Sequence, residues 1–237
     1  MIKIENTEIY GWRAAVRGMR NALESWDKSD STFEGEPGYF NYIGKADLEL
    51  AKRLIAAGDD HGKVARYLEV LVDITAPFYF WKEFKTYRKG RKFHDDGDEL
   101  IDPEELEIHI ETNSCSTMHK IAAKEFTLDD FSHEHLTLYS HDGEICRDFL
   151  GTLEDLVDEL NVARKLYLDT KDKTWWWQMI QLLPSSYNQK RTVKLNYQVL
   201  RKMYHARKNH KLNEWHTFCD WIETLPYSEL ITGEKRK

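Results

Sequence analysis

The chain has 237 residues, of which 41% are hydrophobic and 32% charged. That length buries a substantial core, and the composition is that of a globular protein rather than a disordered one. No segment approaches the roughly eighteen apolar residues that a membrane span needs, and a net charge of −7 argues against a general nucleic-acid binder. The three cysteines are widely spaced and form no disulfide framework, so we expect a cytoplasmic protein.

The first third of the chain mixes helical and strand patterns. Apolar residues recur at three- and four-residue steps in residues 7–26 and again in 46–57, and Gly58 suits the end of the second segment. A β-branched run follows, and Pro77 suits the first turn of a helix after it. We therefore expect helices over 7–26, 46–57 and 78–88, a strand over 67–74, and a loop over 29–42.

The remainder of the chain is predominantly helical. Residues 89–112 begin basic and turn acidic, and we expect them to form an exposed insertion beside the functional site. The small, polar stretch 113–120 follows. Apolar periodicity then predicts helices over 151–168, 174–183, 190–206 and 209–221. The pattern indicates an α+β fold, rich in helix, in a single domain over 1–237 with an insertion at about 89–112.

Simple metal and nucleophile motifs are incomplete. His133 and His135 would share a face only on a strand, His205 and His210 fit one helical face poorly, and no Cys or carboxylate completes a four-ligand set. We therefore predict no metal site. Cys115 lies among hydroxyl side chains, but no nucleophile elbow surrounds it, and the chain lacks a glycine-rich phosphate loop.

The remaining candidates for an anionic ligand are arginines. Arg88, Arg191 and Arg207 fall near the ends of predicted helices or turns, where a guanidinium can bind phosphate with two parallel hydrogen bonds. On residue types alone, the alternative is that these arginines belong to a solvated face.

Two blocks carry a resemblance to a known family. Residues 72–88 read as a strand, an Ala-Pro pair and a helix that ends in Thr86-Tyr87-Arg88, and Asn113 with Ser116 follows after the insertion. The second block runs from Leu183-Pro184 through Asn196 and Leu200 to Arg207. Together they resemble the flavin-dependent thymidylate synthases, the ThyX family, over about residues 45–225. Thr86 and Met118 stand where the family has arginines.

The resemblance implies a fold, a reaction and an assembly. It implies a ThyX-like α+β fold, helix-rich with a small, mostly antiparallel sheet, and a homotetramer. It also implies FAD as cofactor, with NADPH and methylenetetrahydrofolate as co-substrates. The implied enzyme methylates dUMP, or a related pyrimidine deoxynucleotide, at C5 by means of the folate and reduced flavin, and it has neither nucleic acid nor membrane as partner.

The resemblance also implies roles for individual residues. Arg207 and Ser116 would be catalytic and would bind the nucleotide, and Glu83 stands where the family has a Gln that contacts the nucleotide. The residues implied for the cofactor are Tyr87, Arg88, Asn196 and His210. Because two motif arginines are replaced, the alternative is a non-catalytic homologue of the same fold that acts as a nucleotide-binding or assembly protein.

Overall fold

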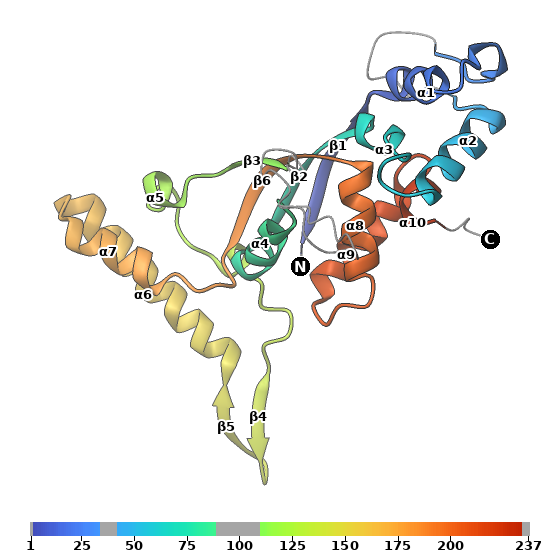
Figure 1. The fold of residues 1–237 in the computed structure, drawn as a ribbon. Coiled ribbons are helices and arrows are strands. Elements are labelled where there is room, and N and C mark those ends of the chain that lie inside the picture. Colours follow the sequence, from blue (N-terminus) through green and yellow to red (C-terminus); the bar gives the residue numbers. More distant parts are fainter. Residues whose placement is uncertain (1, 34–41, 89–109, 234–237) are drawn as a thin grey trace, which may run out of the picture. The chain divides into compact units, whose positions relative to one another are not determined.

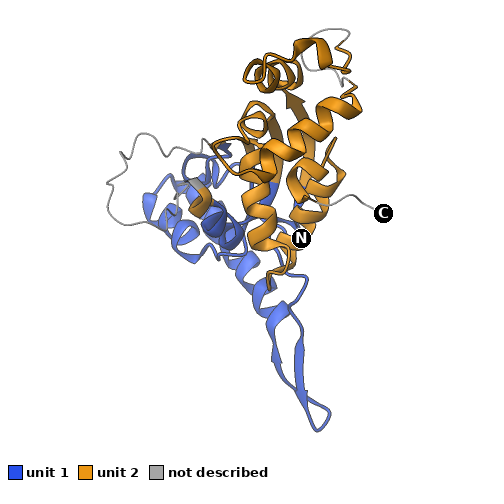
Figure 2. Ribbon diagram, turned by 45° about the vertical axis from the view of Figure 1, so that its right-hand side comes forward, with its two compact units in different colours: residues 1–3, 75–84, 113–191 blue, residues 4–74, 85–112, 192–237 orange. Residues whose placement is uncertain are grey.

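The computed structural model describes residues 2–33, 42–88 and 110–233, which form a helix-rich α+β fold (Figure 1). The chain divides into two units (Figure 2). Unit 1 comprises residues 1–3, 75–84 and 113–191, and unit 2 comprises 4–74, 85–112 and 192–237. Each unit is therefore built from segments that are distant in the sequence.

A small antiparallel sheet has the strand order β1-β2-β6-β3. Its strands are β1 (Lys3–Tyr10), β2 (Glu69–Pro77), β3 (Glu111–Ser114) and β6 (Asn188–Asn196). In the two middle strands, β2 and β6, buried residues alternate with more exposed ones along the strand. In β2, Val70, Val72 and Ile74 are buried while their neighbours are partly exposed. This period of two is the expected result of side chains pointing to opposite faces of a sheet.

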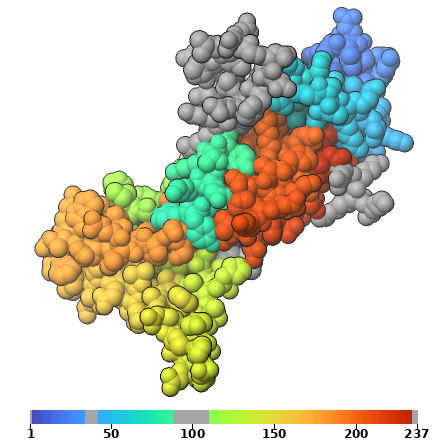
Figure 3. All heavy atoms as spheres, turned by 60° about the horizontal axis from the view of Figure 1, so that its bottom comes forward, coloured from blue at the N-terminus to red at the C-terminus, as the bar shows by residue number. Residues whose placement is uncertain are grey.

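The helices of unit 2 come from both ends of the chain. They are α1 (Trp12–Asn21), η1 (Trp26–Lys28), α2 (Lys45–Ala56), α3 (Val64–Tyr67), η2 (Lys85–Arg88), α8 (Tyr197–Arg207), α9 (Asn213–Thr224) and α10 (Glu229–Thr232). Helix α10 packs against α8, α9 and α2, and α3 packs against α8. In the space-filling view, the orange-to-red C-terminal segment lies beside the blue-to-cyan N-terminal segment of the same unit (Figure 3). The ring of Trp12 joins the two ends, because it packs edge-on against Tyr197 and Tyr227.

Unit 1 has its own apolar core. Its elements are α4 (Phe78–Phe84), α5 (Thr117–Lys120), η4 (Leu128–Asp130), the antiparallel hairpin β4 (Leu138–His141) and β5 (Glu144–Asp148), α6 (Phe149–Thr170) and α7 (Lys173–Leu182). Helices α6 and α7 pack against each other. One face of α6 contributes Leu153, Val157 and Leu160 to a buried cluster with Phe131 and Met179.

Several predicted elements are confirmed. The helices expected over 46–57, 151–168 and 174–183 are α2, α6 and α7. The strand expected over 67–74 is β2, which begins two residues later and continues to Pro77, and the helix expected after Pro77 is α4 followed by η2. The helix expected over 209–221 is α9, which begins at Asn213.

The helix predicted over 190–206 is wrong in its first part. Residues 188–196 form strand β6, and α8 begins only at Tyr197. Gln189, Arg191, Val193 and Leu195 are buried in alternation, which is the pattern of a strand. Two of the four buried residues are polar, so the apolar residues of this segment do not alternate over a length that indicates a strand.

Other boundaries also differ from the predictions. Residues 7–10 belong to β1 and not to a helix, and the last predicted residues of that helix, Leu23 and Trp26, are exposed. The hairpin β4–β5 was not predicted. The predicted insertion ends earlier than expected, since 111–112 belong to β3, and its residues 89–109 lie outside the described residues, as do 34–41 of the predicted loop. Among the described helices, none has the length and apolarity to cross a membrane.

Candidate functional site

A cation flanked by two aromatic rings lies in unit 2. The guanidinium carbon of Arg207, the last residue of α8, lies 5.3 Å from the ring centre of Tyr87 and 4.9 Å from that of Trp215. The two rings are themselves in edge-on contact, with centres 6.0 Å apart. Cation–π attraction of about 0.5–2 kcal/mol per contact holds the guanidinium in this position. Two residues predicted separately from the resemblance, Tyr87 and Arg207, thus meet.

The segment after Arg207 adds His210 to this cluster. The His210 ring contacts Trp215 edge-on at 6.3 Å between centres. Its Nδ1 accepts a hydrogen bond from the backbone N–H of Leu212, at 3.2 Å. A ring nitrogen that accepts carries no proton, so the N–H donor of this ring is at Nε2. Glu214, in the first turn of α9, is buried.

Asn196 lies at the opposite end of α8, where it is the N-cap. Its side-chain oxygen accepts a hydrogen bond from the backbone N–H of Val199 at 3.0 Å. The cap uses the amide oxygen, and the amide NH₂ is the group that can donate to a ligand. Because α8 has 11 residues, Asn196 and Arg207 are separated by roughly 16 Å along the helix axis.

The other predicted site residues belong largely to unit 1. Ser116 is exposed and is the N-cap of α5, where its hydroxyl oxygen accepts from the backbone N–H of His119 at 3.1 Å. Glu83 is half-buried on α4. The backbone of Arg88 ends η2, but its side chain lies outside the described residues. The roles of these residues remain predictions.

Arg191 does not belong to a solvated face, which was one of the two alternatives for it. It lies on β6 in unit 1 and is 8% exposed. Its Nε and one terminal nitrogen donate to the side-chain oxygen of Gln189 at 3.0 and 2.7 Å, and its guanidinium lies 4.4 Å from the ring centre of Trp81. Gln189 in turn donates to the carbonyl of Cys115 at 2.7 Å. Arg191 therefore stabilises the backbone beside Ser116.

The sequence did not indicate Trp215 as a site residue. It is one of eight tryptophans, and its position in α9 has the spacing of an ordinary core residue. Its ring is fully buried, yet one part of it contacts the guanidinium of Arg207. Among the residues that the structure describes, no three His, Cys, Asp or Glu side chains are grouped to bind a metal.

Solved structures of known proteins have a similar fold. The flavin-dependent thymidylate synthase ThyX from Helicobacter pylori, solved with FAD and dUMP, aligns with a TM-score of 0.61 over 98% of each chain, at 15% identity. The fold is therefore that of ThyX. The UMP/dUMP methylase PolB from Streptomyces cacaoi, solved with 5-Br dUMP, aligns with a TM-score of 0.56 over 98% of this chain and 94% of PolB, at 13% identity. No protein-family model and no curated protein matches the sequence.

The two replaced arginines of the ThyX pattern lie on short helices. Thr86 is exposed on η2, and Met118, on α5, has 50% of its surface exposed. The backbone carbonyl of Met118 accepts a hydrogen bond from the indole N–H of Trp176 at 3.1 Å. Neither side chain supplies the positive charge that the ThyX pattern has at its position.

Proposed function

We propose that this protein is an FAD-dependent enzyme of the thymidylate synthase type, which methylates dUMP or a related pyrimidine deoxynucleotide at C5. The observation that carries the proposal is the position of Arg207 between Tyr87 and Trp215, in a chain with the ThyX fold. In this proposal the methylene group comes from methylenetetrahydrofolate and the electrons from NADPH.

Arg207 would bind the nucleotide. A guanidinium presents several N–H donors in a fixed plane, and the two rings restrict the orientation of that plane before a ligand arrives. The same rings cover part of the half-buried guanidinium, which strengthens its attraction for a phosphate or for negative charge on the uracil. Ser116, with its hydroxyl hydrogen still available to donate, would hydrogen-bond the phosphate, and Glu83 would contact the nucleotide.

The donor groups in unit 2 fit a flavin. Asn196 offers an amide NH₂ and His210 an imidazole N–H, which suit the carbonyl edges of the ring system, while Tyr87 offers an aromatic face. Arg88 would meet the phosphates. The roughly 16 Å between the two ends of α8 calls for an extended cofactor or for sites shared between chains. When bound, the flavin supplies the redox chemistry, and the protein residues bind and orient the reactants.

The test of the nucleotide site is Arg207→Lys, measured by calorimetric titration with dUMP. Lysine keeps the charge but not the planar pair of donors, so we expect binding to weaken about ten- to a hundredfold, or 1.5–3 kcal/mol, while the circular dichroism stays unchanged. The matched control is Arg17→Lys, an exposed arginine on α1, which we expect to bind as the wild type does. Equal affinities for all three proteins, or a wild type that does not bind dUMP, would refute the proposal.

A second pair of variants separates the cap from the cofactor contact at Asn196. Asn196→Asp keeps an oxygen acceptor for the Val199 N–H but removes the NH₂ donor, so we expect weaker flavin binding with unchanged stability. Asn196→Ala removes both and should also lower the free energy of unfolding by about 1 kcal/mol. Flavin absorbance of the purified proteins reads out the cofactor. A colourless wild type that takes up no added FAD would favour the non-catalytic alternative, which the replacements at Thr86 and Met118 suggest.

A further inference from the structure

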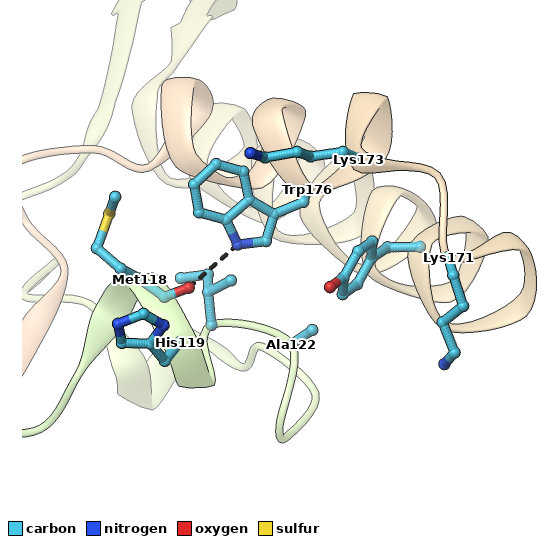
Figure 4. A pocket seen from close by; sticks show the side chains of 8 residues that line it. Met118, His119, Ala122, Lys171, Lys173 and Trp176 are labelled. Atoms are coloured by element: carbon cyan, nitrogen blue, oxygen red, sulfur yellow. Dashed lines mark hydrogen bonds between the residues drawn. The ribbon is translucent and has the colours of Figure 1, made fainter.

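Unit 1 contains a cavity that is lined by none of the residues to which we assign a role in binding nucleotide or flavin. Its volume is about 490 Å³, within the range of roughly 300–1,000 Å³ that small-molecule sites occupy. It lies between α5 and the α6–α7 turn (Figure 4). Eight residues line it: Met118, His119, Ile121, Ala122, Tyr167, Lys171, Lys173 and Trp176.

The apolar wall of the cavity is fixed in place. Trp176 reaches from α7 toward α5, where its indole N–H donates to the carbonyl of Met118 at 3.1 Å (Figure 4). Ile121, which is 5% exposed, continues into the core cluster of unit 1, and Trp176 and Tyr167 pack against that cluster. Two aromatic rings and aliphatic side chains therefore offer a surface that suits a flat apolar group.

The charge of the cavity wall is positive. Lys171 and Lys173 flank the α6–α7 turn, and none of the eight described lining residues is acidic, although the whole chain carries a charge of −7. The Lys173 ammonium lies 5.7 Å from the ring centre of Trp176. Lys171 ends α6 with a φ of 58°, and its ammonium donates to the carbonyl of Leu168 at 2.7 Å. Lys173 is therefore the cation placed against the aromatic wall.

We propose that this cavity binds a planar aromatic anion: a flat ring system against Trp176 and Tyr167, with its acidic group paired to Lys173. The rings supply apolar contact, and the Lys173 ammonium beside them supplies the counter-charge for a carboxylate or a phosphate. Lys171 adds positive charge without a direct contact. None of the residues assigned above to the nucleotide or the flavin lines this site, although Met118, at the position of a ThyX arginine, does.

The probe is 2-naphthoate, titrated calorimetrically into the full chain. We expect saturable binding that weakens about tenfold or more in Lys173→Gln, because the charge pair is lost. The matched control is Lys165→Gln, an exposed lysine on the neighbouring helix α6 that does not line the cavity, and it should bind as the wild type does. Both lysines are exposed, so both variants are expected to fold, which circular dichroism verifies.

Two further ligands define the chemistry of the site. The neutral amide 2-naphthamide should bind at least tenfold more weakly than the acid. Comparing 2-naphthoate with 2-naphthyl phosphate shows which acidic group the site prefers, and a Lys173-dependent affinity for either supports the proposal. Saturating dUMP should not displace the probe, whether or not dUMP binds elsewhere. The proposal is overturned by absence of binding at millimolar probe, by equal affinity of Lys173→Gln and wild type, by equal affinity of acid and amide, or by displacement with dUMP.

Discussion

Asp47 is a carboxylate with no exposed surface, and it organises the first part of unit 2. It accepts a hydrogen bond from Arg20 Nε at 2.7 Å and from the hydroxyls of Ser29 and Ser31, each at 2.6 Å. Burial by itself would raise its pKa, but the hydrogen bonds from both serines and from Arg20 outweigh burial, and the pKa is lowered from its ordinary value. One side chain thus connects α1, the segment after η1, and α2.

Removing this charge is expected to destabilise the protein strongly. Asp47→Asn leaves the Arg20 guanidinium buried without its counter-charge, so we expect the free energy of unfolding to fall by about 3–5 kcal/mol. Urea denaturation measures the loss, and Asp155→Asn on the exposed face of α6 is the control, expected to change it by less than about 0.5 kcal/mol. A loss as small as the control's would show that Asp47 contributes little.

The interaction between Asp47 and Arg20 also makes the stability of the protein depend on pH. Because the pKa of Asp47 is lower in the folded than in the unfolded chain, its ionised form stabilises the fold above the ordinary value of 3.8. That contribution disappears as the pH falls through the lowered folded-state value. Asp47→Asn should remove this part of the acid destabilisation, which denaturation at a series of pH values below 5 would detect.

At the candidate site, the sequence identified some residues and missed others. The resemblance placed Tyr87 and Arg207 among the site residues, and the structure brings their side chains together. It did not indicate Trp215, because nothing in the local pattern distinguishes a tryptophan that contacts a cation from one that fills a core. Nor did residue types reveal that Arg191 is covered by Trp81 and Gln189, since those contacts join residues far apart in the chain.

Among the elements, the junction between β1 and α1 depends on Gly11. Its φ is 95°, and a Cβ built there would lie 1.9 Å from the backbone carbonyl oxygen of Tyr67. Any side chain at this position is therefore strained and also displaces the end of α3, to which Tyr67 belongs. The junction explains why residues 7–26 form a strand and a helix and not one continuous helix.

A pair of identical substitutions tests this junction. Gly11→Ala should lower the free energy of unfolding by more than about 2 kcal/mol, from positive φ and the backbone clash together. Gly18→Ala, inside α1, meets only the Tyr67 ring at 3.9 Å. It should raise stability by about 0.5–1 kcal/mol, because alanine favours a helix. Thermal melts compare the stability of the two variants. Changes in stability of the same sign would contradict the role assigned to Gly11 at the junction.

Strand β6 shows the limit of pattern reading. Its buried face contains Gln189 and Arg191 beside Val193 and Leu195, so a search for apolar spacing finds no strand. Helices such as α6 were predictable because their buried residues are all apolar and repeat over 22 residues. Hairpin β4–β5 was not predicted because all nine of its strand residues are exposed, and only Asp142-Gly143, with φ of 52° and 81°, gives a turn signal.

At the scale of the molecule, that hairpin suggests assembly. Leu138, Tyr139 and Ile145 each have more than half of their surface exposed, as does Tyr67 elsewhere, and a two-stranded hairpin is marginally stable by itself. Apolar residues gathered on one exposed element are typical of an interface between proteins. The homotetramer implied by the ThyX resemblance would give such residues a partner.

Light scattering tests the assembly. We predict a mass near four times the chain's 28.1 kDa at micromolar concentration. Ile145→Asp should shift the mass toward smaller species, because a buried charge opposes association. A monomeric wild type would contradict the prediction and would weaken the enzyme proposal as well.

The way unit 2 closes has a consequence during synthesis of the protein. The indole of Trp221 donates to Thr7, the hydroxyl of Tyr227 accepts from the Ile43 N–H, and the Tyr197 N–H donates to the Leu68 carbonyl. These contacts join residues 4–74 to residues 192–237. During translation, residues 4–74 leave the ribosome long before the C-terminal segment that packs against them. At roughly 5–20 residues per second, the apolar face of β2 waits on the order of ten seconds for its cover. The nascent chain thus exposes a hydrophobic strand until translation is nearly complete, and this interval is when it most needs a chaperone.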